Sequence, residues 1–493
     1  MNPCKLIIKD EINIRIEGLP VDIRRKLVSA FKFIDPSVKY TAAVKLGRWD
    51  GSINFFGIGG DGYLYHLPKI ITILQKNDYE ITELEDLRNN HSITFPEIST
   101  EFWGDICWPK GHQHEGKPIR IREDQVEAIN LFLKNPQSIQ QLSTGYGKTI
   151  LISTMVKICE PYGRTLTIVP NKSLVEQTEK DFINCGLDVG VYYGGRKDLN
   201  KTHTICTWQS LNVLDKKTKT FLEKQEVLTL DKFLTNINTV IVDECHALKG
   251  VILKNLITKR LNNCPIRWGL TGTVPKEDFN ENSLYTSIGP LVNKVLASEL
   301  QEKGILSTCH IHIKQLIDIQ QFKDYHQEHK FLVSDPDRIC YISGMIKDIS
   351  QNGNTLVLVN NIETGKLLQK YLKEQGIDAA FVKGSVKSED RREEYDAFET
   401  ETSKILIATY GVAAVGINII SLYNLVLIES GKSFIKVIQS IGRGLRKGFD
   451  KDHVNIYDIT SSCKYSKRHL TERKAYYKEA QYPFTIKKID WNV

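Results

Sequence analysis

Short apolar runs, separated by helical stretches, constrain the fold of this chain more than any other feature. They fall into two sets of five, namely Ser138–Ser143, Thr165–Pro170, Thr202–Thr207, Thr239–Asp243 and Arg267–Thr271, then Thr355–Asn360, Ala379–Lys383, Ile405–Thr409, Leu425–Glu429 and Val454–Ile459. Runs of Val, Ile and Leu that alternate with helices are typical of parallel sheets, whose strands are buried on both faces. The sequence therefore predicts an α/β fold with two tandem parallel-sheet lobes.

The segments outside these lobes differ in composition. Residues 1–90 combine an alternating stretch, Leu6–Ile16, with a predicted helix, Asp22–Phe33, and a turn-rich string, Gly47–Gly51. This mixture predicts a small α+β accessory domain. The expected parts are the accessory domain at 1–90, a Pro- and Gly-rich linker at 91–118, the first lobe at 119–300, a polar inter-lobe connection at 301–340, the second lobe at 341–460 and a C-terminal segment at 461–493.

Positive charge is concentrated near the C-terminal end of the sequence. The net charge of +7 permits a polyanionic partner without requiring one. Residues 461–493 hold eight Lys or Arg and three acidic residues, interleaved with aromatic residues. Two interpretations fit this segment: it lies on a phosphate backbone, or it is a solvated helix whose aromatic side chains pack on the preceding lobe. A second charged stretch, Leu214–Asn238, is predicted to be a helical insertion.

Ten cysteines are scattered along the chain, without a Cys-x-x-Cys pair or a Cys/His cluster at metal spacing. This pattern argues against a zinc site, an iron–sulfur cluster or a disulfide framework, and it favours reduced thiols in a cytoplasmic setting. No apolar run approaches the roughly 18 residues that span a bilayer. We therefore expect neither secretion nor membrane insertion.

The segment Ser143–Thr149 is the first candidate site, and it lies between a predicted strand and the helical run Ile150–Ile158. A glycine-rich turn that enters a helix points backbone N–H groups and the positive end of the helix dipole at a phosphate. The expected nucleotide-binding residues are Thr144, Gly145, Tyr146, Gly147, Lys148 and Thr149. Lys148 is expected to reach the β- and γ-phosphates, and Thr149 to coordinate magnesium. Leu142 replaces the first glycine of the full pattern.

A second candidate site follows the apolar run Thr239–Val242, which ends in Asp243-Glu244-Cys245-His246. A buried parallel strand delivers carboxylates at its carboxyl end, where ligands of open α/β sheets bind. We expect Asp243 to hold magnesium and Glu244 to orient or deprotonate the water that attacks the γ-phosphate.

Together these motifs resemble those of the superfamily-2 helicases of the DExH type, which are ATP-driven motors with two RecA-like lobes. Further first-lobe motifs appear in the family order. The resemblance implies nucleotide contacts at Arg122 and Gln125, a catalytic role for His246, coupling of nucleotide state to strand grip by Thr271, Gly272 and Thr273, and nucleic-acid contacts at Pro170, Asn171, Lys172, Gly194, Gly195, Thr207, Trp208 and Gln209.

The second lobe completes the set of family motifs. The resemblance implies nucleic-acid contacts at Asn360, Thr409 and Tyr410, nucleotide contacts at Gly416 and Asn418, and catalytic roles for Gln439, Arg443 and Arg446. An arginine supplied by the facing lobe neutralises charge on the transferring phosphoryl group. We assign that role to Arg443 and Arg446 jointly.

Within the superfamily, the chain looks most like the UvsW-type branched-DNA helicases of phages. Asp-Glu-Cys-His, Thr207-Trp208-Gln209 and the string Gly47–Gly51 carry this likeness. It implies ATP and Mg²⁺ as cofactors, a monomeric motor with three-prime to five-prime polarity, branched DNA as substrate, and the host cytoplasm as location if a phage encodes the chain. Trp49 alternatively fills the core of its own small domain.

Other functions share the same core motifs. An RNA helicase would have its ATPase stimulated by RNA, and a restriction-enzyme translocase would accompany a nuclease, for which no convincing Asp…Asp/Glu-x-Lys pattern appears. A non-catalytic binding or annealing protein would have lost motor residues. The presence of Lys148, Glu244, Arg443 and Arg446 argues against that last alternative.

Overall fold

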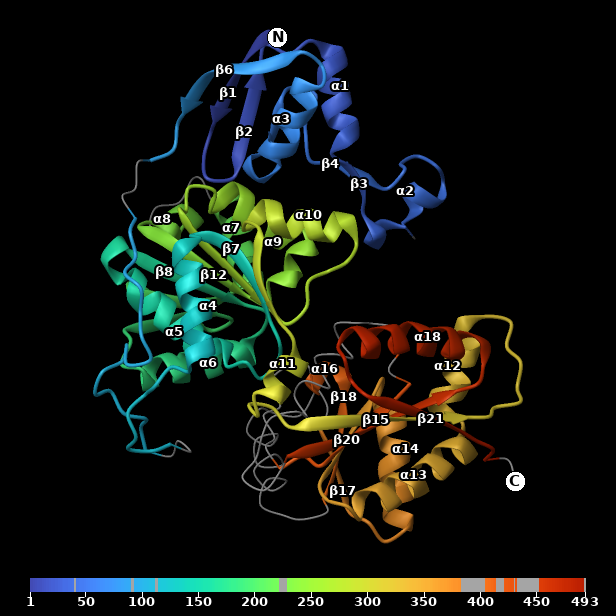
Figure 1. The fold of residues 1–493 in the computed structure, drawn as a ribbon. Coiled ribbons are helices and arrows are strands. Elements are labelled where there is room, and N and C mark those ends of the chain that lie inside the picture. Colours follow the sequence, from blue (N-terminus) through green and yellow to red (C-terminus); the bar gives the residue numbers. More distant parts are fainter. Residues whose placement is uncertain are drawn as a thin grey trace. The chain divides into compact units, whose positions relative to one another are not determined.

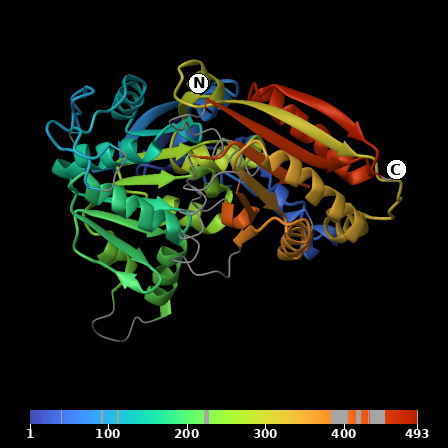
Figure 2. The same ribbon diagram turned by 90° about the horizontal axis from the view of Figure 1, so that it is seen from below.

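The computed structural model describes residues 1–39, 41–89, 93–110, 114–220, 228–382, 404–413, 421–429, 431 and 452–491. The chain divides into a first unit, residues 1–142 and 147–294, and a second unit, residues 143–146 and 295–493. Figures 1 and 2 show that each unit holds its own parallel sheet with helices on both sides. Among the described residues, none of the helices is both long and apolar enough to span a membrane.

The first unit begins with a small mixed sheet of order β5-β2-β1-β6. Strand β1 pairs antiparallel with β2 and parallel with β6, and α1 and α3 cover the sheet. This agrees with the predicted α+β accessory domain. Its elements are β1 (Asn2–Ile8), β2 (Asn13–Glu17), α1 (Val21–Ala30), β3 (Lys32–Ile34), η1 (Pro36–Val38), α2 (Ala42–Lys45), β4 (Ser52–Asn54), β5 (Asp61–Tyr63), η2 (Leu64–His66), α3 (Leu67–Gln75) and β6 (Tyr79–Asp86).

Trp49 lies just before β4, which pairs antiparallel with β3, and it is not part of the fully buried core of this small domain. Its indole N–H donates to the carbonyl of Ser52 at 2.9 Å, and the side chain is half-buried. The buried apolar cluster instead joins residues of the small domain, such as Ile14 and Phe55, to Phe279 of the following lobe. The alternative in which Trp49 fills the core is therefore wrong.

Polar and aromatic contacts fix the small domain to the first lobe. The buried guanidinium of Arg267 donates to the carbonyl of Glu11 and to Oε1 of Gln137, both at 2.8 Å. The Nζ atom of Lys254 lies 3.6 Å from the centroid of the Phe55 ring. Because a buried cation needs compensating partners, these contacts hold the two parts of the first unit together.

The first lobe is an eight-stranded sheet of order β10-β9-β11-β8-β12-β13-β7-β14, in which the pairs from β9 through β7 are parallel. All five predicted strands are present. Its elements are α4 (Glu123–Lys134), β7 (Gln137–Leu142), α5 (Lys148–Cys159), η3 (Glu160–Tyr162), β8 (Arg164–Val169), α6 (Lys172–Asn184), β9 (Val189–Tyr193), β10 (Arg196–Lys197), β11 (His203–Thr207), α7 (Trp208–Thr220), α8 (Leu230–Leu234), β12 (Ile237–Asp243), η4 (Cys245–Lys249), α9 (Val251–Arg260), β13 (Ile266–Thr271), α10 (Asp278–Ser287) and β14 (Leu291–Val295).

The second unit contains a seven-stranded parallel sheet of order β17-β18-β16-β19-β20-β15-β21. The five strands predicted for this lobe are again present. Its elements are α11 (Ala297–Glu302), β15 (Thr308–Leu316), α12 (Tyr325–Ser334), α13 (Pro336–Ser350), β16 (Thr355–Val359), α14 (Ile362–Glu374), β17 (Ala379–Val382), β18 (Ile405–Thr409), α16 (Tyr410–Ala413), β19 (Asn424–Ile428), β20 (His453–Ser461), α18 (Lys464–Glu479) and β21 (Phe484–Ile489).

One expectation about this unit needs correction, and the structure favours one of the two interpretations of the C-terminal segment. Residues 301–340 are not only a connection, because β15 is a strand of the second sheet between β20 and β21. It was missed because His and Lys alternate with its apolar residues and make the stretch polar. In the C-terminal segment, Tyr477 and Tyr482 are buried, which favours packing of the aromatic residues on the lobe.

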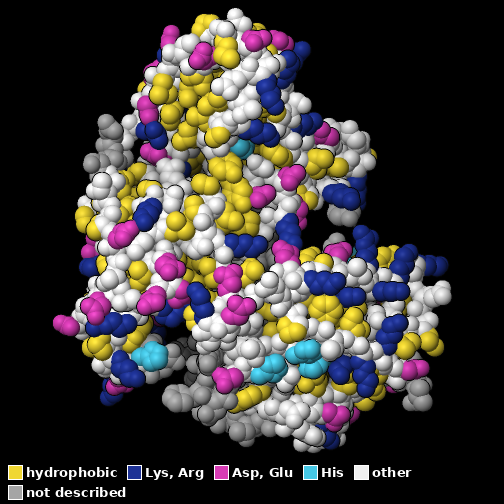
Figure 3. Space-filling model, viewed as in Figure 1, with side chains coloured by type: hydrophobic (Ala, Val, Ile, Leu, Met, Phe, Trp, Pro, Cys, Tyr) yellow, Lys and Arg dark blue, Asp and Glu magenta, His cyan; other side chains and the backbone are white. Residues whose placement is uncertain are grey.

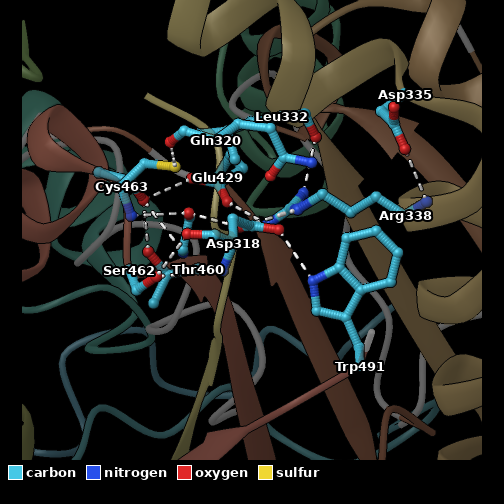
Figure 4. A network of polar contacts seen from close by, with 12 residues as sticks. Asp318, Gln320, Leu332, Asp335, Arg338, Glu429, Thr460, Ser462, Cys463 and Trp491 are labelled. Atoms are coloured by element: carbon cyan, nitrogen blue, oxygen red, sulfur yellow. Dashed lines mark hydrogen bonds and ion pairs between the residues drawn. The ribbon is translucent and has the colours of Figure 1, made fainter. Parts of the chain in front are cut away.

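A buried polar network joins the strand ends of the second unit (Figure 4). Arg338 of α13 donates to Oε1 of Glu429 at 2.7 Å and to Oδ2 of Asp318 at 3.3 Å. The indole N–H of Trp491 donates to Oδ1 of Asp318 at 2.8 Å. The network thus links the ends of β15 and β19 to α13 and to the C-terminal segment.

Candidate functional site

The turn after β7 has the backbone geometry of a phosphate loop. Gly145 and Gly147 have φ of +89° and +88°, in the left-handed region that favours glycine. Helix α5 begins directly at Lys148, so its first N–H groups lie at the turn. A Cβ atom on Gly147 would lie 2.6 Å from Nε2 of Gln125. Both the positive φ and the nearby Gln125 side chain therefore favour glycine at this position.

Other predicted nucleotide residues lie at the same turn. Thr144 and Tyr146 belong to the turn itself, and Thr149 is the second residue of α5. Gln125 is buried in the first turn of α4 and accepts a hydrogen bond from the backbone N–H of Arg122 at 3.2 Å. The pair Arg122 and Gln125 is thus held beside the glycine-rich turn, and its contact with the nucleotide stays a prediction.

An ion pair joins the turn to the acidic end of β12. Nζ of Lys148 lies 2.7 Å from Oε1 of Glu244 and 3.8 Å from Oδ1 of Asp243. The relative solvent exposure of the side chain is 13% for Lys148, 19% for Glu244 and 14% for Asp243. These three groups lie together although β12 and α5 are distant in sequence. The site is largely shielded from water and still open to a ligand.

His246 and Thr271 extend this arrangement toward β13. Nδ1 of His246 lies 3.3 Å from Oε2 of Glu244 and 3.0 Å from Oγ1 of Thr271. The Thr271 hydroxyl in turn donates to the carbonyl of Thr273 at 2.9 Å, with Gly272 between them. A continuous chain of polar contacts therefore leads from Lys148 to the predicted coupling residues.

Burial and charge set the protonation of this cluster. Burial disfavours the charged form of Lys148, but the Glu244 and Asp243 carboxylates outweigh it and raise the lysine pKa. Burial alone would raise the pKa of Glu244, yet Lys148 and His246 lower it. Burial is the first cause that raises the pKa of Asp243. The cluster therefore holds Glu244 ionised and Lys148 charged.

Glu244 also has an unusual backbone conformation. Its φ is +52° and its ψ +48°, which non-glycine residues adopt at an energetic cost. The turn aims the carboxylate back toward Lys148 instead of along β12. Strained residues of this kind cluster at functional sites, where the surrounding structure holds them.

Gly269 on β13 makes room for the third residue of the acidic motif. A Cβ atom at this position would lie 2.9 Å from Sγ of Cys245 and 3.1 Å from Cγ1 of Ile139. Cys245 is fully buried, and burial raises the pKa of its thiol well above the ordinary value. Cys245 is thus a packing residue between Glu244 and His246, with a neutral thiol.

A pocket of about 520 Å³ lies at the carboxyl ends of β8, β9 and β11. Predicted nucleic-acid contacts that line it are Pro170, Asn171, Lys172, Gly194, Thr207 and Gln209. Gly195 follows in the adjoining turn, and Trp208 instead packs against the lobe's apolar core. The structure thus brings together six of the eight predicted first-lobe contacts.

Ser210 continues the predicted Thr207-Trp208-Gln209 string and also lines the pocket. Four further residues line the pocket that sequence reasoning missed, namely Tyr192, Tyr193, Lys197 and Val213. The two tyrosines end β9, an apolar run that adjoins the predicted Gly194-Gly195 contact and could have been read as a strand. The phenol of Tyr193 donates to Oε1 of Glu176 at 3.0 Å, and Nζ of Lys172 lies 5.6 Å from its ring. The pocket therefore combines cations, aromatic rings and polar groups.

Predicted residues of the second unit are only partly described. Asn360 follows β16 and its amide donates to the carbonyl of Glu429. Thr409 ends β18, and the side chain of Tyr410 is buried at the start of α16. The remaining predicted residues, Gly416, Asn418, Gln439, Arg443 and Arg446, lie outside the described residues.

Family models match both lobes of the chain. The model "Type III restriction enzyme, res subunit" matches residues 118–276, and "Helicase conserved C-terminal domain" matches residues 337–448. The chain belongs to the superfamily-2 helicases. It is therefore an ATP-dependent helicase.

Individual relatives agree with this assignment. The chain is 26% identical over 370 residues to the ATP-dependent DNA helicase uvsW of Enterobacteria phage T4, covering 71% of this chain and 70% of the relative. It is 33% identical over 190 residues to the DNA 3'-5' translocase XPB2 of Sulfurisphaera tokodaii, covering 38% of each. The structure of S. cerevisiae Dbp5 bound to RNA and ADP BeF3 matches with a TM-score of 0.52, 17% identity and coverage of 76% and 91%. That last likeness supports the fold alone.

The contact between Gly269 and Cys245 makes a prediction about stability. Gly269→Ala should lower the free energy of unfolding by about 1–3 kcal/mol through overpacking, and it should reduce ATPase activity because Glu244 and His246 flank the displaced Cys245. Adding Cys245→Ala should recover part of both losses. Urea unfolding and ATP turnover measure the two effects.

The buried Cys264 supplies the matched control for this double-mutant cycle. Cys264→Ala combined with Gly269→Ala should give additive losses, since Cys264 is not among the nearest neighbours of a Cβ at Gly269. Additive losses for the Cys245 pair as well would contradict the proposed contact.

Proposed function

We propose that this helicase is a DNA motor that uses ATP and Mg²⁺ to remodel branched DNA in the cytoplasm, in replication, recombination and repair. One observation supports it most: the Lys148–Glu244 cluster and the 520 Å³ pocket lie at the carboxyl edge of one parallel sheet. A change at the first site can therefore reach the second through a rigid element. This arrangement suits a motor in which ATP turnover changes the grip on a strand.

The first step of the proposed cycle is an exchange of partners by Lys148. With the nucleotide bound, the ammonium group would leave Glu244 and contact the β- and γ-phosphates. Loss of the neighbouring positive charge would raise the pKa of Glu244 toward that of a more effective base. The ion pair would thus keep the carboxylate poor as a base until the substrate arrives.

The residues around this cluster fit a magnesium ion. Mg²⁺ in nucleotide sites typically uses one or two carboxylates or hydroxyls together with substrate phosphates. The hydroxyl of Thr149 at the helix start and the partly exposed carboxylate of Asp243 are donors of that kind. These two residues would hold the ion, which would neutralise charge on the transferring phosphoryl group.

His246 and Thr271 would transmit a change in the bound nucleotide from Glu244 to the predicted coupling residues Gly272 and Thr273. Hydrolysis changes the charge next to Glu244, which contacts His246, and His246 contacts Thr271. Gly272 and Thr273 follow at the end of β13. We assign Arg443 and Arg446, with Gln439, to the completion of the site from the second lobe.

The choice of branched DNA rests on two observations. The small domain is fixed to the first lobe by Arg267 and Lys254, so it would move with the motor and could engage the duplex ahead of it. The relatives named uvsW and XPB2 are a DNA helicase and a DNA translocase by name. We propose that the DNA substrates are forks, R-loops and four-way junctions. The motor would act as a monomer and move in the three-prime to five-prime direction.

Comparing nucleic acids as activators tests the substrate. ATP turnover should rise with single-stranded DNA, a fork and a four-way junction, and the branched substrates should be converted to products. Lys148→Ala should abolish both activities, which excludes a contaminating ATPase. Stimulation by RNA alone, without action on forks or junctions, would refute the DNA assignment and favour an RNA helicase.

The exchange mechanism predicts distinct effects of two substitutions. Glu244→Gln should bind ATP as well as the native chain does or better, because Lys148 is released from its ionic partner, while turnover falls by about 100-fold or more. Nucleotide affinity and single-turnover hydrolysis separate the two effects. Retained hydrolysis would remove Glu244 from the proposed role of base.

The pocket predicts a local effect on DNA binding. Lys172→Ala should weaken binding of single-stranded DNA and lower the salt slope by about 0.7, as expected for one lost phosphate contact. Lys180→Ala removes an exposed lysine from the same helix, α6, outside the pocket and should leave the slope unchanged. Equal effects of the two substitutions would show that the pocket has no special role.

A further inference from the structure

Histidine and lysine side chains form a strip across the three strands β20, β15 and β21 of the second unit. The strip is defined by His310, His312, Lys314, His453, Tyr457 and Lys487. Parallel pairing sets His312 beside Tyr457 and Lys314 beside Lys487, so these side chains share one face of the sheet. Figure 3 shows histidine side chains of this unit on the viewed face, near Lys and Arg side chains.

The face that bears the strip is covered elsewhere in the sheet. Helices α13 and α14 bury the corresponding residues of β16 and β19, such as Val357 and Val426. Leu316 at the end of β15 is still buried on this face, whereas the side chains of the strip are half-exposed or exposed. The alternate residues of β15, such as Ile311, are buried on the opposite face. The strip is therefore a polar surface at the edge of a well-packed sheet.

Among the residues that the structure describes on these three strands, no acidic side chain lies on the face of the strip. Lys314 and Lys487 are direct neighbours in the register, and burial followed by the charge of Lys487 lowers the pKa of Lys314. Like charges placed opposite one another destabilise a sheet. The folded chain thus tolerates an unfavourable contact that an anionic ligand would relieve.

The groups around His312 are also mostly basic. Burial lowers its pKa most, the hydrogen bond with Asn455 opposes this, and the nearby His310, Lys314 and His453 lower it further. Acidic residues of these strands lie elsewhere, since Asp458 is on the other face in a salt bridge with Arg473, and Asp452 and Asp490 lie beyond the strand ends.

Ring geometry adds a second property to the strip. The rings of His310 and His312 are 4.7 Å apart, and those of His312 and Tyr457 are stacked at 5.1 Å with 24° between their planes. Side chains on one face of a strand repeat about every 6.6 Å, which is comparable with the phosphate spacing of an extended nucleic-acid strand. Lys314 and Lys487 add positive charge beside these rings, and positive charge next to aromatic rings is the combination that binds single-stranded nucleic acid.

We propose that the strip binds a single strand of DNA through its phosphates, outside the contacts implied by the helicase motifs. This proposal rests on the proposed DNA motor function and adds a second track on the second unit. A track of this kind would hold one displaced strand of a fork while the motor acts on the other.

Removing the opposed lysines tests the track. The full-length double variant Lys314→Gln and Lys487→Gln should bind an oligothymidine about threefold to tenfold more weakly at moderate salt, with a salt slope lower by about 1.4. Its thermal midpoint should stay equal or rise, since repulsion is removed. The matched control Lys366→Gln and Lys373→Gln takes the same charge from exposed positions of α14 and should change neither quantity.

A lower midpoint with unchanged affinity would assign these lysines a structural role and overturn the proposal. An equal loss of affinity for a blunt duplex would also overturn it, because the strip would then be a general polyanion surface.

Proton uptake supplies an independent test. Phosphate contact favours the imidazolium form, so the affinity of the native chain for the oligothymidine should rise as pH falls from 8 to 6. In the variant His310→Gln and His312→Gln this rise should be reduced at least twofold. An unchanged pH profile would remove the histidines from the track.

The two proposals fail in different ways. DNA-stimulated ATP turnover of the native chain tests the motor function, and it does not depend on the strip. A native chain that is stimulated by DNA, with lysine variants of unchanged salt slope, would overturn the track alone.

Discussion

Parallel strand pairing is the constraint on which the rest of this structure depends. In the first lobe, β7, β12 and β13 run side by side in the same direction, so their carboxyl ends meet at one edge. That edge joins Lys148, Glu244 and Thr271, which come from separate parts of the sequence. The neighbouring strands β8, β9 and β11 end at the same edge and form the 520 Å³ pocket. One rule of sheet geometry therefore places the Lys148–Glu244 cluster and the pocket on one rigid element.

At that edge, the positive charge of Lys148 stabilises the ionised carboxylate of Glu244. A buried carboxylate without a partner is strongly destabilising, and Lys148 satisfies Glu244 in the chain alone. A bound phosphate offers the lysine a stronger partner with more charge. In the proposed mechanism, the same interaction that stabilises the fold without nucleotide would be exchanged when the nucleotide enters.

Local sequence patterns were sufficient for much of this fold and for the core of the site. The buried strands β8, β12, β16 and β18 are continuous apolar runs, and a glycine-rich turn before a helix requires left-handed backbone at Gly145 and Gly147. These signals depend on neighbours in sequence. They are strong because a strand buried on both faces has little freedom in composition.

Contacts between distant segments were beyond the reach of such patterns. Strand β15 looks polar because one of its faces is open at the sheet edge, and β21 is an edge strand with exposed lysines. The docking of the small domain depends on Arg267, whose partners Glu11 and Gln137 lie far away in the sequence. The arginine motif remains a prediction from family resemblance, since it lies outside the described residues.

Two of the buried ion clusters among the described residues illustrate how exposure separates a structural role from a proposed functional one. In the second unit, Arg338 and its partners Asp318 and Glu429 are 0% to 6% exposed (Figure 4), so no ligand can replace them without unfolding the strand ends. In the first unit, the side chains of Lys148 and Glu244 are 13% and 19% exposed. A phosphate can approach the second pair and not the first. A fully buried ion cluster therefore fixes the strand ends of the second unit, and a partly exposed one in the first unit is open to a phosphate.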